Sequence, residues 1–121
     1  MEQKLKNRTK NFALKIVQLA DTLPKTTAAF VLGKQLICSA TSVGANYRSA
    51  CRGRSKAEFI SKLGIVVEEA DETCFWLELI IESELLPQPT VKPLLLEANE
   101  FTAIFVASIK TSQKIKNYEN S

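Results

Sequence analysis

Residues 39–80, SATSVGANYRSACRGRSKAEFISKLGIVVEEADETCFWLELI, decide the fold of this chain. The stretch has the pattern of two long helices, of which these are the inner halves, joined by a tight corner. Gly53 stands where the end of a helix favours a residue that can take a positive φ. Ser55, followed three residues later by Glu58, forms a capping box that starts the next helix. The stretch therefore predicts a helical hairpin that turns at residue 54.

The composition fits one globular domain, residues 1–121. Hydrophobic residues make up 45% of the chain and charged residues 24%, which argues against disorder. No run approaches about 18 uncharged apolar residues, so we expect no membrane span, and the polar N-terminus has no secretion signal. Cys38, Cys51 and Cys74 are odd in number and scattered, which indicates free thiols. We therefore expect a cytoplasmic protein.

The chain lacks residues that several classes of catalytic and metal-binding sites require. The chain has no histidine, which excludes Ser-His-Asp and Cys-His catalysis and every metal site that needs histidine. Three scattered thiols make a poor zinc site, and no glycine-rich phosphate loop is present. Glu69 and Glu72 could form an acid/base pair, but no other catalytic group accompanies them, so a structural role is the better interpretation. We expect no enzymatic activity, no cofactor and no metal.

The charge is distributed unevenly along the chain. Residues 1–57 carry eleven Lys/Arg against two acids, which gives +9; residues 58–100 carry ten acids against two lysines, which gives −8; the last 21 residues add +2. Such an asymmetry can mark a nucleic-acid surface. It can equally mark two complementary surfaces that meet each other.

Apolar residues at steps of three and four predict four amphipathic helices, at about 7–23, 26–52, 56–85 and 91–116. Pro24 ends the first helix, and Thr26 or Thr27 caps the second. The apolar face of the third helix is too broad for contact with one neighbour, so we expect it to be covered on two sides. Short connections between such helices are typical of an all-α, antiparallel up-down-up-down four-helix bundle, and we predict this fold.

A polar stripe runs beside the apolar seam of the second predicted helix. A turn at residue 54 places Gly44 opposite Gly64 and brings this stripe near acids of the third helix. Because buried polar groups need partners, we predict a structural network between the helices, formed by Ser39, Ser42, Asn46, Glu69 and Glu72. Tyr47 and Trp76 are predicted core or subunit-interface residues, since aromatic residues anchor both.

Basic residues gather around the corner. Arg48, Arg52 and Lys56 recur every four residues, which directs them to one side of the hairpin end. One interpretation is a phosphate-binding patch, because Lys/Arg clusters supply most non-specific affinity for nucleic acids. The other is a solvated end, or ion pairs with an acidic neighbour. The candidate nucleic-acid-binding residues are Lys34, Arg48, Arg52, Arg54 and Lys56.

Motifs along nearly the whole chain form a familiar combination: SATSVGANYR, SKAEF and EEADETCFWLEL, with RTKNFALKIV in the first helix and LPK before the second. In this combination the chain resembles the four-helix-bundle family of proteins encoded in 23S rRNA intervening sequences. The accessory variability determinant of diversity-generating retroelements is similar. Two positions depart from the family pattern: Ser49 stands where an acid is more frequent, and Glu68 where a base is frequent. These departures make the second helix more basic and the third more acidic.

The resemblance implies a ring-forming bundle, typically a pentamer, without known enzymatic activity. It also implies that a relative binds nucleic acid and a reverse transcriptase through basic surfaces. We therefore expect a non-enzymatic homo-oligomer that binds RNA, or a nucleic-acid–protein assembly, through a basic surface. The alternative is a structural or adaptor homo-oligomer that binds a protein partner, with the charge split serving subunit pairing. The expected partners are further copies of the chain, RNA or another nucleic acid, and a nucleic-acid-processing protein, with no membrane.

Overall fold

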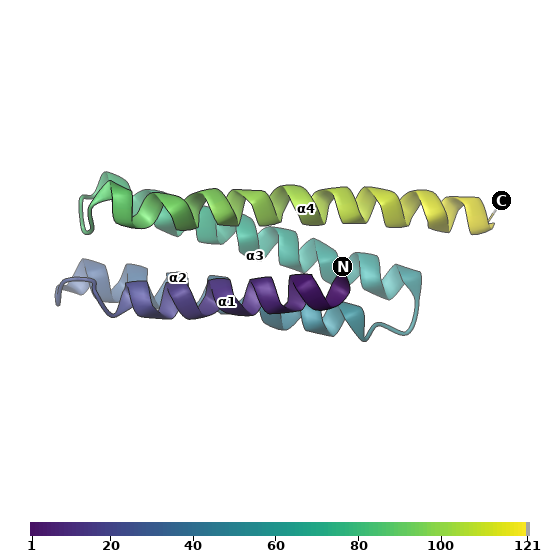
Figure 1. The fold of residues 1–121 in the computed structure, drawn as a ribbon, viewed down its shortest axis with the longest axis horizontal. Helices are drawn as coiled ribbons and strands as arrows, with labels where there is room; N and C mark the ends of the chain where they lie inside the picture. Colours follow the sequence, from purple (N-terminus) through teal and green to yellow (C-terminus); the bar gives the residue numbers. More distant parts are fainter. Residues whose placement is uncertain (121) are drawn as a thin grey trace.

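The computed structural model describes residues 1–120, which form four helices: α1 (Glu2–Ala20), α2 (Thr27–Cys51), α3 (Lys56–Glu82) and α4 (Gln88–Asn120). Successive helices run antiparallel (Figure 1). α3 packs against both α2 and α4, whereas α1 packs mainly against α2 and only lightly against α4. This arrangement confirms the predicted all-α up-down-up-down bundle. Ser121, the last residue of the predicted domain, lies outside the described residues.

α1 differs most from its predicted bounds of 7–23. It starts at Glu2, because Leu5 and Thr9 are buried and extend the apolar face toward the N-terminus. It ends at Ala20, where the amides of Thr22 and Leu23 donate to carbonyls three residues back and tighten the chain before the turn. The polar segment that precedes residue 7 is therefore part of the bundle.

The other helices also differ at their ends from the predictions 26–52, 56–85 and 91–116. α2 is one residue shorter at each end, and Thr26 caps it by accepting a hydrogen bond from the Ala29 amide at 3.2 Å. α3 ends at Glu82, because Glu84 takes a positive φ of 58° and lets the Leu85 amide reach the Ile80 carbonyl. α4 is longer at both ends than predicted.

The corner between α2 and α3 confirms one half of the sequence interpretation. Ser55 caps α3 by accepting a hydrogen bond from the Glu58 amide at 3.1 Å, while the Glu58 carboxylate reaches the Arg54 amide at 3.5 Å. The positive φ expected at Gly53 was wrong, since no glycine has one among the described residues. Gly53 instead provides space: a Cβ there would lie 3.0 Å from the Ala50 carbonyl oxygen. Gly53 thus allows the two helices to turn tightly.

Aromatic rings join three of the helices in the core. Phe12 of α1 meets Phe101 of α4 edge to face at 5.3 Å, and Phe101 stacks on Phe105 at 6.1 Å. Tyr47 of α2 contacts Phe105 at 5.1 Å. All four side chains are buried. Edge-to-face and offset pairs of this kind add to the free energy gained from burial.

The broad apolar face of α3 is covered on two sides, as predicted. Its seven buried residues lie between α2 and α4, and they are Leu63, Val66, Ala70, Thr73, Cys74, Leu77 and Ile80. A broad stripe on a bundle helix does not require a second subunit when two neighbours cover it. The width of the apolar face of α3 therefore does not indicate self-association.

α2 is long and apolar enough to cross a membrane by length and composition, with a mean hydropathy of 1.2 over 18 residues. From the sequence we expected no membrane span, because no run approaches about 18 uncharged apolar residues. In the bundle, α2 packs between α1 and α3. Core helices of bundles commonly have the same composition, because they are apolar on more than one side.

Candidate nucleic-acid interface

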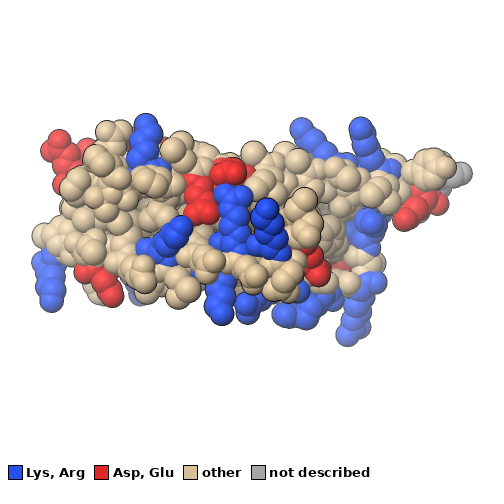
Figure 2. Space-filling model, viewed as in Figure 1, with Lys and Arg blue, Asp and Glu red and all other residues tan. Residues whose placement is uncertain are grey.

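The antiparallel fold brings three basic segments to one end of the bundle. These segments are the start of α1, the corner between α2 and α3, and the end of α4 (Figure 1). We call this region the basic end and define it by its nine cations: Lys4, Lys6, Arg48, Arg52, Arg54, Lys56, Lys110, Lys114 and Lys116. The same segments hold three acids, Glu2, Glu58 and Glu119, so nine minus three gives +6. Figure 2 shows Lys and Arg side chains gathered toward this end.

The cations of the corner are available to a ligand. Arg48, Arg52 and Arg54 are exposed, and Lys56 is partly exposed. The ion pairs among the described residues join Lys6 to Glu2, and Arg8 to two acids of α4. None of them involves a corner cation. Within the described residues of one copy, the alternative of ion pairs with acids therefore does not hold for the corner cations.

Arg8 contrasts with the corner cations because its charge is already compensated. Its guanidinium lies 3.1 Å from Glu97 and 2.9 Å from Glu100, and 4.8 Å above the Phe101 ring. Burial acts against the charged form, but hydrogen bonds to Glu100 and Glu97 outweigh it, so the pKa of Arg8 is raised. Arg8 therefore ties α1 to α4.

Lys34 does not belong to the basic end. It lies on α2 near the turn from α1, fourteen residues before Arg48, which corresponds to about 21 Å along a helix. Conversely, the sequence interpretation missed the cations at the start of α1 and the end of α4. Antiparallel topology, once predicted, could have placed those chain ends beside the corner.

The predicted polar network differs from the observed contacts. The hydroxyl of Ser39 donates a hydrogen bond to the Leu36 carbonyl of its own helix. It also accepts a hydrogen bond from the Thr73 hydroxyl at 2.9 Å, which links the side chains of α2 and α3. Ser42 and Asn46 instead bond to carbonyls of their own helix, at 2.6 and 2.8 Å. Helical residues of these types commonly satisfy themselves four residues back. Gly44 does not face Gly64 either: a Cβ on Gly44 would lie 3.4 Å from the Thr9 hydroxyl of α1, and a Cβ on Gly64 would meet nothing within 4 Å.

The side chains of Glu69 and Glu72 take no part in that contact, although the Glu69 backbone carbonyl also accepts from the Thr73 hydroxyl at 2.8 Å. Glu69 is partly exposed and its pKa is raised, first by burial and then by the charges of Glu72 and Glu68. Because this pKa is higher in the folded than in the unfolded chain, the stability of the fold decreases as the pH rises toward and through the folded-state pKa of Glu69. At neutral pH, Glu69 and Glu72 therefore repel each other. No group of three potential metal ligands lies together in residues 1–120.

Replacing Asn46 by Ala should change stability by no more than about 0.5 kcal/mol, because Asn46 bonds only within α2 and is partly exposed. Replacing Ser39 by Ala should cost about 0.5–1.5 kcal/mol, because it removes a buried hydrogen bond between helices. Urea denaturation of both variants measures the difference. A larger loss for Asn46→Ala than for Ser39→Ala would contradict the observed pairing.

The two aromatic candidates have different surroundings. Tyr47 is buried in the core, and burial, followed by its hydrogen bond to Cys51, raises the pKa of its hydroxyl. Trp76 is partly buried and packs edge to face on Phe75 at 5.1 Å, next to an exposed surface. Burial also raises the pKa of the Cys51 thiol. Cys51 therefore holds less thiolate at neutral pH than a free cysteine, although the charge of Lys6 acts in the opposite direction.

Comparisons with known proteins agree with this architecture. The family described as "23S rRNA-intervening sequence protein" matches residues 1–107. A crystal structure from Bacteroides thetaiotaomicron, described as a protein of unknown function from the S23 ribosomal protein family, superposes with a TM-score of 0.83. The two chains are 36% identical, and the match covers 91% of this chain and 99% of the other. No curated protein matches the chain. This chain is therefore a member of the 23S rRNA-intervening sequence protein family.

Proposed function

We propose that this protein is a non-enzymatic homo-oligomer that binds RNA, or an RNA-containing protein assembly, through its basic end. The observation that carries this proposal is the convergence of nine cations from three separate segments, against three acids, on one end of the bundle. Lys/Arg groups that neutralise phosphates supply most of the affinity in binding that does not depend on sequence. The basic end would therefore contact the phosphate backbone rather than the bases.

Repetition of the basic end around a closed oligomer would strengthen this binding. Linked weak sites can exceed the affinity of one site by about 10²–10⁴ when the geometry permits simultaneous contact. The resemblance implies a pentamer, and we adopt that assembly as part of the proposal. Such a ring would hold several basic ends in a fixed arrangement and favour long or folded RNA over short strands.

A second function is favoured by a separate observation. Two large apolar side chains, Phe30 and Phe75, are 72% and 52% exposed. Exposed aromatic residues often mark protein interfaces. The protein could therefore serve as a structural or adaptor homo-oligomer that binds a protein partner, with its charge split serving the pairing of subunits.

A titration of the protein with RNA at increasing salt concentrations separates the two functions. We expect binding to single-stranded and duplex RNA regardless of sequence, with an affinity that falls linearly on a log–log plot against salt. The oligomeric mass should be measured by light scattering on the same sample. No detectable binding at low salt, with the oligomer intact, would reject the RNA-binding function and leave the adaptor function.

A further inference from the structure

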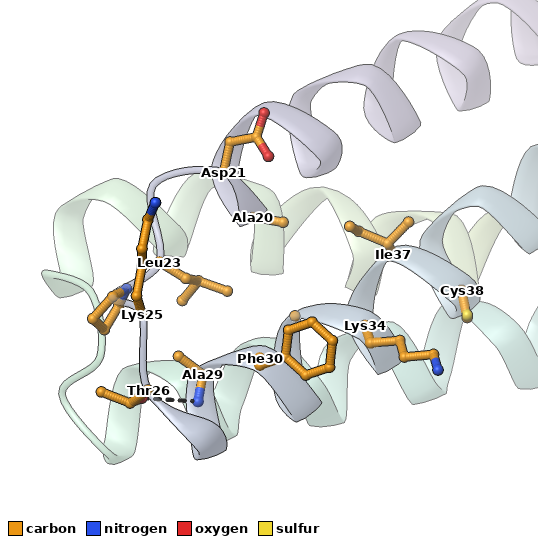
Figure 3. A pocket seen from close by; sticks show the side chains of 12 residues that line it. Ala20, Asp21, Leu23, Lys25, Thr26, Ala29, Phe30, Lys34, Ile37 and Cys38 are labelled. Atoms are coloured by element: carbon orange, nitrogen blue, oxygen red, sulfur yellow. Dashed lines mark hydrogen bonds between the residues drawn. The ribbon is translucent and has the colours of Figure 1, made fainter.

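An apolar groove lies between the end of α1 and the first half of α2, at the end of the bundle opposite the basic end. Its volume is about 690 Å³. Leu23 and Ile37 line it, and Phe30 projects beside them (Figure 3). Lys25 and Lys34 lie at its rim. The groove therefore combines an apolar lining with positive charge that no ion pair among the described residues neutralises.

The outer face of α3 has the complementary character. Phe75 is 52% exposed and is held against Trp76, so its ring is presented in a defined position. Four exposed acids surround it at helical spacings of three, four and seven residues, and they are Glu68, Asp71, Glu72 and Glu78. No lysine or arginine follows Lys62 in α3. We call this surface the acidic face of α3.

The groove and the acidic face cannot meet within one copy. The groove is formed by α1 and α2, whereas the acidic face is the outer face of α3, and the backbones of α1 and α3 do not approach each other closely in the described part of the bundle. The charges are also opposite in sign: Lys25 and Lys34 outnumber Asp21 at the groove, and the acidic face carries four carboxylates. Opposite charges around apolar centres favour one orientation and exclude like-charged pairings.

We infer that the groove binds the acidic face of α3 from a second copy, with Phe75 of one copy entering beside Phe30 of the other. The inference rests on the self-association in the proposed function and is independent of the nucleic-acid binding. The contact joins two different surfaces, so a pair of copies keeps a free acidic face on one copy and a free groove on the other. Contacts of this kind close into rings or extend as filaments, according to the rotation between copies.

Complementary variants test the pairing. In Phe30→Ser the groove is impaired but the acidic face is intact; in Phe75→Ser the reverse holds. Both positions are largely exposed, so each variant should fold and remain a monomer of 13.5 kDa. A mixture of the two should form a dimer of twice that mass and nothing larger, because only one competent contact is left. Light scattering after size exclusion measures these masses, and circular dichroism verifies the fold.

Leu96→Ser provides the matched control, because Leu96 is 57% exposed on α4 and belongs to neither surface. This variant should keep the mass of the parent. The inference is overturned if either phenylalanine variant keeps the parental mass, or if the mixture remains monomeric. A monomeric parent would remove the self-association of the proposed function as well, while the RNA titration would still decide the function of the basic end.

Discussion

Replacement of Arg48, Arg52 and Arg54 by glutamine should abolish most of the affinity of the protein for RNA while the bundle stays folded. The three side chains are exposed and form no ion pair with the residues that the structure describes, so their removal costs little stability. Each lost phosphate contact reduces the slope of log affinity against log salt by about 0.7 for single strands and about 0.9 for duplexes. If all three contact phosphates, the slope should fall by about two to three units.

The matched control removes the same charge elsewhere. Lys10, Lys15 and Lys92 are exposed and lie outside the basic end, so their replacement by glutamine should reduce affinity far less. Oligomeric mass must be measured for both triple variants. If the corner variant loses its oligomer first, the arginines pair subunits instead of binding RNA. Equal losses of affinity in the two variants would show that total charge matters and that the basic end does not.

Phe101→Ala should produce the largest loss of stability among single substitutions considered for this bundle. Phe101 is fully buried and contacts Phe12, Phe105 and the guanidinium of Arg8. Truncation of a buried phenylalanine costs about 3–5 kcal/mol through lost transfer free energy and the remaining cavity. Because Phe101 contributes to the limited contact between α1 and α4, we expect part of the loss to appear as loosening of α1.

Urea denaturation, followed by far-ultraviolet circular dichroism, measures this loss in the variant and the parent. Leu96→Ala is the control, since Leu96 lies on the same helix but is 57% exposed, and it should change stability by less than about 0.5 kcal/mol. A loss below about 1 kcal/mol for Phe101→Ala would mean that the core collapses around the cavity or that α1 packs differently.

The sequence predicts the bundle well because helix-forming patterns and the corner signals are local. Ser55 with Glu58 located the start of α3, and apolar periodicity identified all four helices. The start of α1 was missed, because tertiary burial of Leu5 extends a helix that its polar residues do not suggest. Local patterns determine which residues are helical, but burial determines where a helix ends.

Contacts between helices were harder to predict than the helices themselves. The network of Asn46 with two glutamates assumed that one register along the hairpin describes every facing pair. In the structure, Gly44 faces α1, and of the predicted network residues on α2 it is Ser39 whose side chain bonds to α3, because residues a few positions apart on α2 face different neighbours. The sequence located the basic end only in part, for a different reason. Its cations come from segments far apart in the sequence, which the fold alone brings together.

The uneven packing of α1 also has a consequence for local unfolding. α3 is enclosed by two long neighbours, whereas α1 has extensive contact with α2 only and is joined to α4 mainly through Phe12, Arg8 and Phe101. Amide protons of a helix with few tertiary contacts exchange with solvent through partial openings that leave the rest of the protein intact. α1 is then the first helix to open, and its opening would remove one wall of the groove and one strip of the basic end together.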